Sequence, residues 1–385
     1  MKIYDICIVG AGASGLMFAS LASNIFDIAM IDANKILAPK LKISGGGKCN
    51  VTNVFCGVEN FFGDSKFIAP ALQNFSNSDL IAFLRQNGVE TNEVKRVVNG
   101  QIFCKSSTNL IEMFRAKIDK VSFFNCAKVL GAVKNGDLFE IDLSGQKICA
   151  KKLIIASGGV SYPELNATSI GYEIAKNFGH TICAISPALV GFTVQSDEFW
   201  FKALSGISIE AQMKIGDKIF EGGLLFAHKG ISGPVVLNSS LWWKKGKVAI
   251  NFAPKIKDLP KHLQKNKDKN ISNALNLPKN FMKAFLEKIK LQDKKISQLD
   301  LKEIATLCTI QNYEFSPAGT FGFSKAEATR GGVCTDEINA YTMQSNFAPN
   351  LYFLGEVLDV TGELGGYNLQ WAFSSAKICF DNFGK

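Results

Sequence analysis

Hydrophobic and polar positions near the start of the chain follow the pattern of a strand, a helix and a second strand. Residues 3–9 form an apolar run, residues 13–24 have helical spacing, and residues 28–33 form a second apolar run that contains Asp32. Runs of these lengths, separated by a glycine-rich turn, are typical of a β-α-β unit of about 30 residues.

Beyond this unit the pattern predicts a long loop, four further helices and several strands. Strands are expected at 101–104 and in four apolar runs between 123 and 156, with QKICA and KKLIIA as separate strands. The loop-rich stretch spans 34–64, and the helices are expected near 78–87, 107–119, 168–179 and 367–380.

The middle of the chain changes character twice. Alternation from about 190 to 254 predicts a mainly-β domain, and 257–308 has Leu, Ile and Phe at helical spacing among many lysines. We therefore expect an α/β protein with a Rossmann-like domain, an inserted mainly-β domain and a small helical domain. The expected limits are 1–190 with 331–385, then 191–256 with 309–330, and then 257–308.

Composition narrows the class of protein. With 385 residues, 47% hydrophobic and 20% charged, the chain has material for a large core, which excludes intrinsic disorder. No stretch has the roughly 18–20 apolar residues of a membrane helix. Ten cysteines without a CxxC pair, and three histidines away from ligand spacing, predict buried thiols in the cytoplasm and no metal site.

The net charge of +9 is concentrated in one segment. Between Lys255 and Glu303 there are 13 lysines, no arginine and six acids. A nucleic-acid arm is expected to carry arginines and interleaved aromatics, so we favour a solvated helical face that covers the substrate. A flavin-containing RNA-modifying or RNA-binding protein that uses these lysines remains the alternative.

The strongest motif is Gly10-Ala-Gly12-Ala-Ser-Gly15, which follows a strand and opens a helix. Gly10 allows the tight turn, Gly12 lets the backbone approach a pyrophosphate, and Gly15 allows close helix packing. Asp32, 20 residues after Gly12, is placed to accept hydrogen bonds from a ribose. These features predict a dinucleotide site, for either NAD or FAD.

Three distant stretches favour FAD. One is Ala156-Ser157-Gly158 at the end of a strand, and another is the glycine run from Ser44 to Asn50. The third is the C-terminal stretch with Gly355-Glu356 and Gly366-Tyr367-Asn368 at a helix start. A nicotinamide dehydrogenase does not need its C-terminus to return to the cofactor, whereas a large flat flavin benefits from such contacts.

Residues 38–53 and the motifs ASGG, LLFAHKGISGP, ATRGGV and GEVLDVTGELGGYNLQWAFSSA resemble those of the YhiN-like flavoproteins, also described as BaiN-like or aminoacetone-oxidase-like. The resemblance covers almost the entire chain. It implies non-covalent FAD in a domain of the glutathione-reductase type, with a β domain and a helical domain inserted before the C-terminal return.

The resemblance also implies roles for individual residues. It places the pyrophosphate on Gly10, Gly12, Ala13, Ser14 and Gly15, the ribose on Asp32 and Ala33, and adenine beside Val129. It places the ribityl chain and ring beside Lys40, Ser44, Gly45, Gly46, Gly47, Cys49 and Asn50, and it brings Gly355 and Glu356 near the ribityl chain or a phosphate. The turn Ala156-Ser157-Gly158 is expected to give a second close approach of the backbone to the cofactor. Gly366, Tyr367, Asn368 and Leu369 would lie at the pyrimidine end of the ring. Cys49 has no CxxC partner, so packing is favoured over a redox role.

These observations predict an oxidoreductase that moves a hydride between flavin N5 and an unidentified small organic substrate. NAD(P)H and oxygen are the candidate redox partners. Because the chain has one dinucleotide fingerprint, a nicotinamide would bind transiently. The catalytic acid or base and the oligomeric state stay open.

Overall fold

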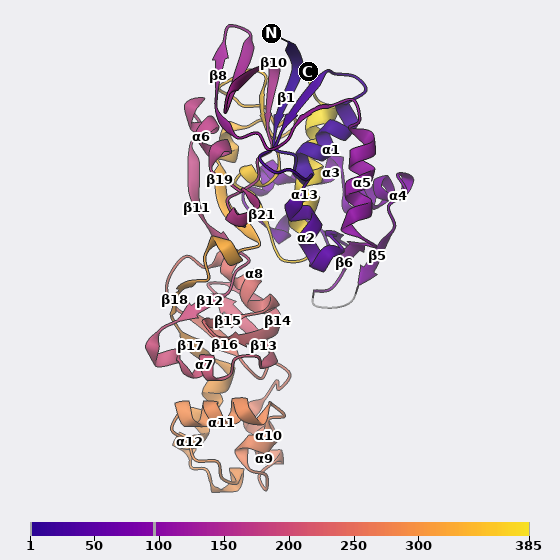
Figure 1. The fold of residues 1–385 in the computed structure, drawn as a ribbon. Coiled ribbons are helices and arrows are strands. Elements are labelled where there is room, and N and C mark those ends of the chain that lie inside the picture. Colours follow the sequence, from indigo (N-terminus) through magenta and orange to yellow (C-terminus); the bar gives the residue numbers. More distant parts are fainter. Residues whose placement is uncertain (1, 95–97, 385) are drawn as a thin grey trace. The chain divides into compact units, whose positions relative to one another are not determined.

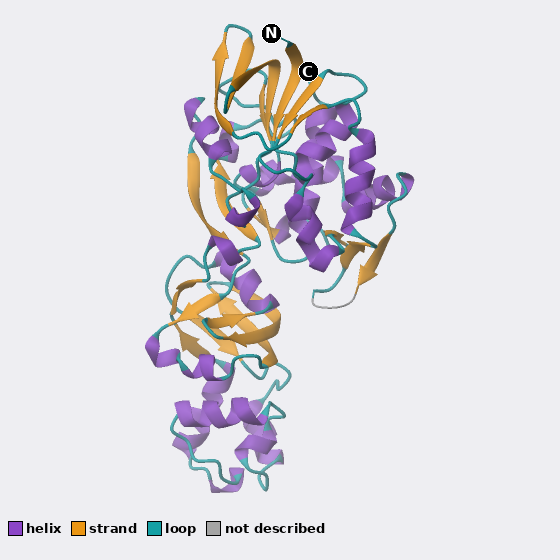
Figure 2. Ribbon diagram, viewed as in Figure 1, coloured by secondary structure: helices purple, strands orange, loops and turns teal. Residues whose placement is uncertain are grey.

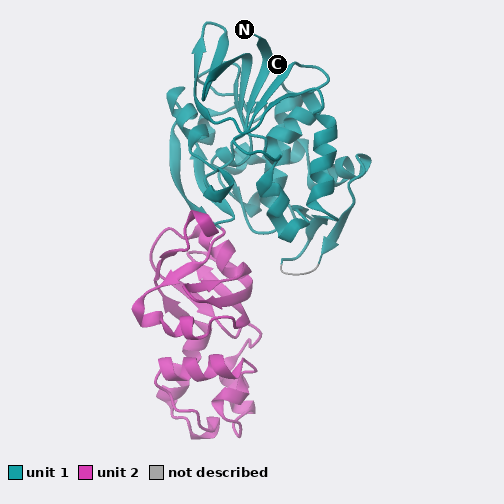
Figure 3. Ribbon diagram, in the orientation of Figure 1, with its two compact units in different colours: residues 1–188, 326–385 teal, residues 189–325 magenta. Residues whose placement is uncertain are grey.

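The computed structural model describes residues 2–94 and 98–384, and the chain divides into two compact units. Unit 1 comprises residues 1–188 and 326–385, and unit 2 comprises residues 189–325 (Figure 3). Each unit has a hydrophobic core of its own. No helix in the described ranges is both long and apolar enough to cross a membrane.

Unit 1 is built on a seven-stranded sheet of order β7-β2-β1-β10-β9-β8, in which β20 also pairs with β10. Strands β7, β2, β1, β10 and β20 are parallel, and β9 and β8 are antiparallel. The strands are β1 (Ile3–Val9), β2 (Ile28–Ile31), β7 (Ser122–Phe124), β8 (Val129–Asn135), β9 (Leu138–Leu143), β10 (Gln146–Ile155) and β20 (Leu351–Phe353). The central residues of this sheet are buried and apolar: all of β2 and β20, Ile6–Val9 of β1 and Leu153–Ile155 of β10.

Helices and three small sheets make up the rest of unit 1 (Figures 1 and 2). The helices are α1 (Ala13–Ala22), α2 (Pro39–Gly47), α3 (Ser65–Asn74), α4 (Asn77–Gln86), α5 (Ser107–Lys117), α6 (Ile170–Asn177) and α13 (Tyr367–Asp381). The small sheets are β3 (Asn50–Asn53), β6 (Gln101–Cys104) and β5 (Thr91–Val94); β21 (Thr361–Gly362) and β4 (Phe61–Phe62); and β11 (Ile182–Ala188) and β19 (Ala328–Val333). Small residues along α13, including Ala372 and Ala376, let it pack closely against α1.

Unit 2 is a seven-stranded antiparallel sheet with a helical segment inserted in the sequence between β16 and β17. The strands are β12 (Phe192–Val194), β13 (Ser208–Ile215), β14 (Lys218–Ala227), β15 (Gly230–Ser232), β16 (Val248–Asn251), β17 (Tyr313–Phe315) and β18 (Pro317–Thr320). The helices are α7 (Trp200–Ala203), α8 (Pro234–Trp242), α9 (Leu259–Lys265), α10 (Ile271–Ala274), α11 (Lys279–Lys288) and α12 (Leu301–Cys308). The sheet and the helices share one hydrophobic core, because Phe252, which directly follows β16, contacts Phe281 and Phe285 of α11.

The N-terminal β-α-β unit and five later elements lie where the sequence predicts them. β1, α1 and β2 match the first unit, and α4, α5, α6, α13 and β6 match the later predictions within a few residues. The prediction of a loop over 34–64 is wrong, because α2, β3 and β4 lie there. Separate strands for QKICA and KKLIIA are also wrong. They form the single strand β10, which is paired with β9 at its start and with β20 at its end.

The cysteines depart from the expectation of ten buried thiols. Cys183 and Cys334 form a disulfide with a Cα–Cα distance of 5.7 Å, at the end of the β11–β19 pair. Cys126 is exposed. Spacing between nearby cysteines does not reveal this bond, because antiparallel pairing brings together two cysteines 151 residues apart.

Candidate functional site

The loops that follow β1, β2, β10 and β20 meet at one edge of the unit 1 sheet. The Gly10 amide donates to the Ile31 carbonyl, and the Ala156 amide donates to the Val9 carbonyl, both at 2.8 Å. The Leu354 amide donates to the Ile155 carbonyl at 2.9 Å. The carboxyl ends of parallel strands form the edge at which α/β sheets bind ligands. Here the sheet brings together four loops that the sequence analysis singled out separately.

The three glycines of the first turn have different surroundings. A Cβ at Gly10 would lie 2.3 Å from the Ala156 oxygen, and one at Gly15 would lie 2.1 Å from the Gly10 oxygen. A Cβ at Gly12 would meet no atom of the chain within 4 Å. Gly10 and Gly15 therefore serve backbone packing, whereas Gly12 leaves an open approach at the N-terminus of α1, where free N–H groups favour a pyrophosphate.

The carboxylate of Asp32 lies beside this open turn. Its oxygens accept hydrogen bonds from the amides of Ala11 at 2.8 Å and Asn34 at 2.7 Å. The amide of Ala127 donates to the Asp32 carbonyl at 3.0 Å, so the segment that leads into Val129 runs alongside. A carboxylate has about four acceptor sites, which leaves capacity for ribose hydroxyls. The adenosine contacts of Asp32, Ala33 and Val129 stay predictions.

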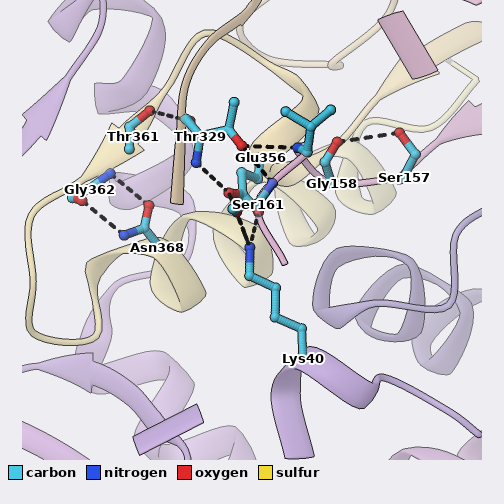
Figure 4. Close-up of polar contacts among 10 residues, drawn as sticks. Lys40, Ser157, Gly158, Ser161, Thr329, Glu356, Thr361, Gly362 and Asn368 are labelled. Carbon is cyan, nitrogen blue, oxygen red and sulfur yellow. Dashed lines mark hydrogen bonds and ion pairs between the residues drawn. The ribbon is translucent and has the colours of Figure 1, made fainter. Parts of the chain in front are cut away.

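A polar network joins the loops after β10 and β20 to α2 and β19 (Figure 4). The Lys40 ammonium forms an ion pair with Glu356 at 3.0 Å and a hydrogen bond with the Ser161 hydroxyl at 2.9 Å. Glu356 also accepts from the Thr329 amide at 2.9 Å. The Thr329 hydroxyl in turn accepts from the amides of Val160 and Ser161 at 3.0 and 3.1 Å. The network fixes the direction of the Lys40 side chain.

Sequence reasoning singled out Lys40 and Glu356 but missed Ser161 and Thr329. Thr329 lies in ATRGGV, a motif noted only for the family resemblance. Its role depends on β19 returning to the loop after β10, which no local pattern indicates. The Ser157 hydroxyl lies 3.5 Å from the Gly158 carbonyl, and Gly158 has a left-handed φ of 72°. A Cβ at Gly158 would meet only Glu356 within 4 Å, so this turn is open beside the network.

Tyr162 and Glu327 adjoin this network and retain their protons to higher pH than usual. Burial raises the pKa of the Tyr162 phenol, and Glu327 and Glu164 raise it further. Burial also raises the pKa of the Glu327 carboxyl, although Lys40 opposes the shift. The Lys40 ammonium lies 5.9 Å from the centre of the Tyr162 ring.

The backbone of Tyr162 is strained. It has the left-handed conformation, with φ 61° and ψ 59°, immediately before Pro163. That conformation costs of order 1–3 kcal/mol for a non-glycine residue and is disfavoured further before proline. Sequence reasoning did not find Tyr162, since neither its spacing nor its neighbours form a known motif.

The glycine run of α2 forms a turn with two open positions. Its backbone leaves helical geometry at Ser44, and Gly45 and Gly46 have left-handed φ of 56° and 66°. A Cβ at Gly46 or Gly47 would meet nothing within 4 Å, so a flat ligand can approach there. Cys49 at the end of the run is buried, which raises the pKa of its thiol to about 12. A neutral thiol is a poor nucleophile, which supports the packing interpretation.

The C-terminal stretch runs from the end of β20 to the start of α13. Gly355 has a φ of 73°, and its carbonyl accepts a hydrogen bond from the Trp371 indole at 3.1 Å. Gly366 begins α13, and a Cβ there would lie 2.3 Å from the Thr52 oxygen. The amide of the Asn368 side chain donates to the Gly362 carbonyl at 2.9 Å, so it holds this turn (Figure 4). The contacts of Gly366, Tyr367, Asn368 and Leu369 with the ring stay predictions.

Comparison with known proteins agrees with this architecture. Residues 4–382 match the family described as HI0933-like protein Rossmann domain. The chain belongs to this family. The resemblance to the YhiN-like flavoproteins is thereby confirmed, and with it the Rossmann-like FAD-binding fold. Members of the HI0933-like family are FAD-dependent oxidoreductases, and so is this chain.

Three relatives match over nearly their full lengths. A ribosomal RNA dihydrouridine synthase of Escherichia coli strain K12 is 34% identical and covers 98% of both chains. The protein of the same name from Haemophilus influenzae is 35% identical over 97% of this chain and 96% of its own. A 3-dehydro-bile acid delta(4,6)-reductase of Clostridium scindens is 28% identical over 96% of this chain and 97% of its own.

The residues present fit FAD. Gly12 and Gly158 leave open approaches to the backbone after β1 and β10, α1 begins at the first of these turns, and Gly46 and Gly47 leave two further open positions in the turn of α2. Gly12 would take the pyrophosphate and Asp32 the ribose. The turn of α2 and the start of α13 would flank the ring.

Proposed function

We propose that the chain reduces a carbon–carbon double bond conjugated to a carbonyl, and that its substrate is uridine in ribosomal RNA. The observation that carries the proposal is the 34–35% identity to two ribosomal RNA dihydrouridine synthases over 96–98% of each chain. Conversion of uridine to dihydrouridine saturates the C5–C6 bond of uracil, which is conjugated to the C4 carbonyl.

The reductase acting on 3-dehydro-bile acids supports the reaction type independently. Its name describes reduction of double bonds conjugated to a 3-oxo group. In both cases a hydride adds to the carbon distant from the carbonyl, a proton adds to the adjacent carbon, and no atom leaves. A small enone is therefore the second candidate substrate.

FAD, when bound, supplies a two-electron hydride carrier between NAD(P)H, which is oxidised to NAD(P)⁺, and the substrate. The residues of the chain must bind the cofactor, orient the substrate and supply the proton. In this proposal the Tyr162 Oη donates the proton to uracil C5 and is then reprotonated by solvent; burial raises its pKa further, so the phenol is protonated at neutral pH. Lys40, held by Glu356 and Ser161, places a positive charge 5.9 Å from the centre of the Tyr162 ring.

The test is to incubate the FAD-loaded protein with NADH or NADPH and unmodified ribosomal RNA, and then to digest the RNA and measure its nucleosides. We expect a uridine derivative heavier by two hydrogens, formed only with reduced nicotinamide. A reaction with NAD(P)⁺ in place of NAD(P)H is the control. Reduction of a conjugated enone without any change in the RNA would favour the second candidate.

A further inference from the structure

The helical segment of unit 2 has a surface dominated by lysine. Of the 13 lysines from Lys255 to Lys302, all but Lys288 and Lys294 are exposed. Lys288 forms an ion pair with Glu198 at 3.1 Å, and Lys294 forms one with Glu303 at 2.7 Å. Within the described part of the chain, none of the other eleven lysines forms an ion pair.

The large apolar side chains of this segment are buried in the core of unit 2. Leu259, Leu263, Phe281, Phe285 and Leu307 are buried in one core with the sheet. None of these five side chains is exposed, so none of them is available to cover a substrate. They serve instead to fold a compact platform whose outward side chains are mostly lysine.

Most acids of the segment have structural partners. Asp258 and Asp300 cap α9 and α12 by accepting from the amides of Lys261 and Glu303. Asp293 accepts from the amide and hydroxyl of Ser272. These carboxylates accept hydrogen bonds from backbone amides and a hydroxyl. They therefore reduce the positive potential of the lysines without forming ion pairs with them.

Backbone pairing gathers five exposed lysines, which we name the lysine cluster. The segment after α9 lies against the segment before α12: the Ile296 amide donates to the Lys269 carbonyl at 3.0 Å, and the Ser297 amide donates to the Lys267 carbonyl at 2.8 Å. The turn of Ile296–Gln298 also contacts α9. The lysine cluster consists of Lys261, Lys265, Lys267, Lys269 and Lys295.

We propose that the lysine cluster binds the phosphate backbone of an RNA substrate. Lysines carry mobile point charges that neutralise phosphates without reading bases, so the surface supplies affinity and position while the flavin site supplies selection. The absence of arginine from residues 255–303, which argued above against a typical nucleic-acid arm, is compatible with a surface that contacts phosphates alone. The proposal rests on the proposed function, because it takes RNA as the polyanion.

The experiment compares two triple variants of the full-length, FAD-loaded protein. Lys265→Gln, Lys267→Gln and Lys269→Gln remove three charges from the lysine cluster. Lys66→Gln, Lys120→Gln and Lys176→Gln remove three exposed charges from unit 1 and form the matched control. Binding to a ribosomal RNA fragment is measured by fluorescence anisotropy from 50 to 300 mM KCl. Flavin content and reduction by NAD(P)H are measured alongside.

For wild type we expect log Kd to rise steeply with log salt. Loss of three phosphate contacts should reduce that slope by about 2–3 and weaken binding at least 10-fold in the first triple variant. The control variant should bind as wild type does, and both variants should keep flavin content and flavin reduction.

Other outcomes separate the two proposals. If the first triple variant binds RNA as tightly as the control, the lysine cluster is not the RNA surface, even where the wild type forms dihydrouridine. If the cluster binds anionic vesicles or heparin but not RNA, the inference is overturned. Lysine-dependent RNA binding without any dihydrouridine would leave the inference standing and remove the proposed function.

Discussion

The glycines of the first turn differ in what a substitution is expected to change: cofactor binding at Gly12 and folding at Gly15. Gly12 has an ordinary φ of −82° and no neighbour within 4 Å of a Cβ, so Gly12→Ala should leave the stability of the apoprotein unchanged. Its methyl group would occupy the open approach to the backbone, and we expect FAD to bind at least 10-fold more weakly. Apoprotein melting temperature and FAD titration by fluorescence quenching check this.

Gly15→Ala is the matched control for that change. Its Cβ would lie 2.1 Å from the Gly10 oxygen, so the substitution should lower the melting temperature even without FAD. If Gly12→Ala keeps wild-type FAD affinity, the pyrophosphate lies elsewhere.

The proton donor is tested by measuring two half-reactions separately: reduction of the flavin by NAD(P)H and reduction of the substrate. Tyr162→Phe should slow substrate reduction by a factor of about 10²–10⁴, the usual contribution of general acid catalysis, while reduction of the flavin by NAD(P)H stays unchanged. Because the pKa of Tyr162 is raised above its usual value near 10, the substrate half-reaction should stay flat from pH 6 to pH 9.

The alternative donor has a different pH signature. The pKa of Glu327 is raised by burial, so this carboxyl loses its proton as pH rises through that value. A rate that falls between pH 5 and pH 8 and becomes flat in Glu327→Gln would assign the proton to Glu327 and contradict the role of Tyr162.

At the scale of elements, the spacing of apolar residues predicted the helices and strands whose limits are marked by nearby residues. The β-α-β unit and α13 have clear periodicity and glycine boundaries, so their limits were predictable. α3 was missed because Pro70 lies inside it, and β10 was split because Ala150-Lys151-Lys152 interrupts its apolar run. β10 changes partner along its length: its first residues pair with β9 and its last residues pair with β20, and the interruption lies at the change.

The disulfide beside the β11–β19 pair can be tested chemically. Non-reducing peptide mapping should recover Cys183 joined to Cys334, and Cys183→Ser should lower the free energy of unfolding by about 2–4 kcal/mol, the usual contribution of a disulfide. Cys126→Ser, at an exposed cysteine outside the disulfide, is the control and should change little. Free alkylation of both cysteines in non-reducing denaturant would contradict the pairing.

At the scale of the whole molecule, the sequence indicated most of the positions now found at the sheet edge but not how they are joined. Gly10, Asp32, Ser157 and Glu356 each carried a local signal next to a strand end. The network around Thr329 had none, because two of its partners, Val160 and Ser161, lie 169 and 168 residues away in the chain. Such contacts follow from strand order, which a single sequence does not reveal.

The division into two cores also changes which deletion is informative. Removing residues 257–308 alone would strip Phe281 and Phe285 from Phe252 and Tyr313, so unit 2 should unfold. Removal of all of unit 2 leaves the other core complete.

Ala188 and Ala328 are direct partners in the antiparallel β11–β19 pair, so a short turn such as Asn-Gly can join residue 188 to residue 327 or 328. We expect this shortened protein to fold, to bind FAD with near wild-type affinity, because every predicted cofactor contact lies in unit 1, and to lose its affinity for RNA. Flavin spectra, thermal melting and RNA anisotropy measure the three properties. A shortened protein that folds and still binds RNA with the wild-type salt dependence would move the RNA surface to unit 1, and one that folds without binding FAD would show that unit 2 contributes to the cofactor site.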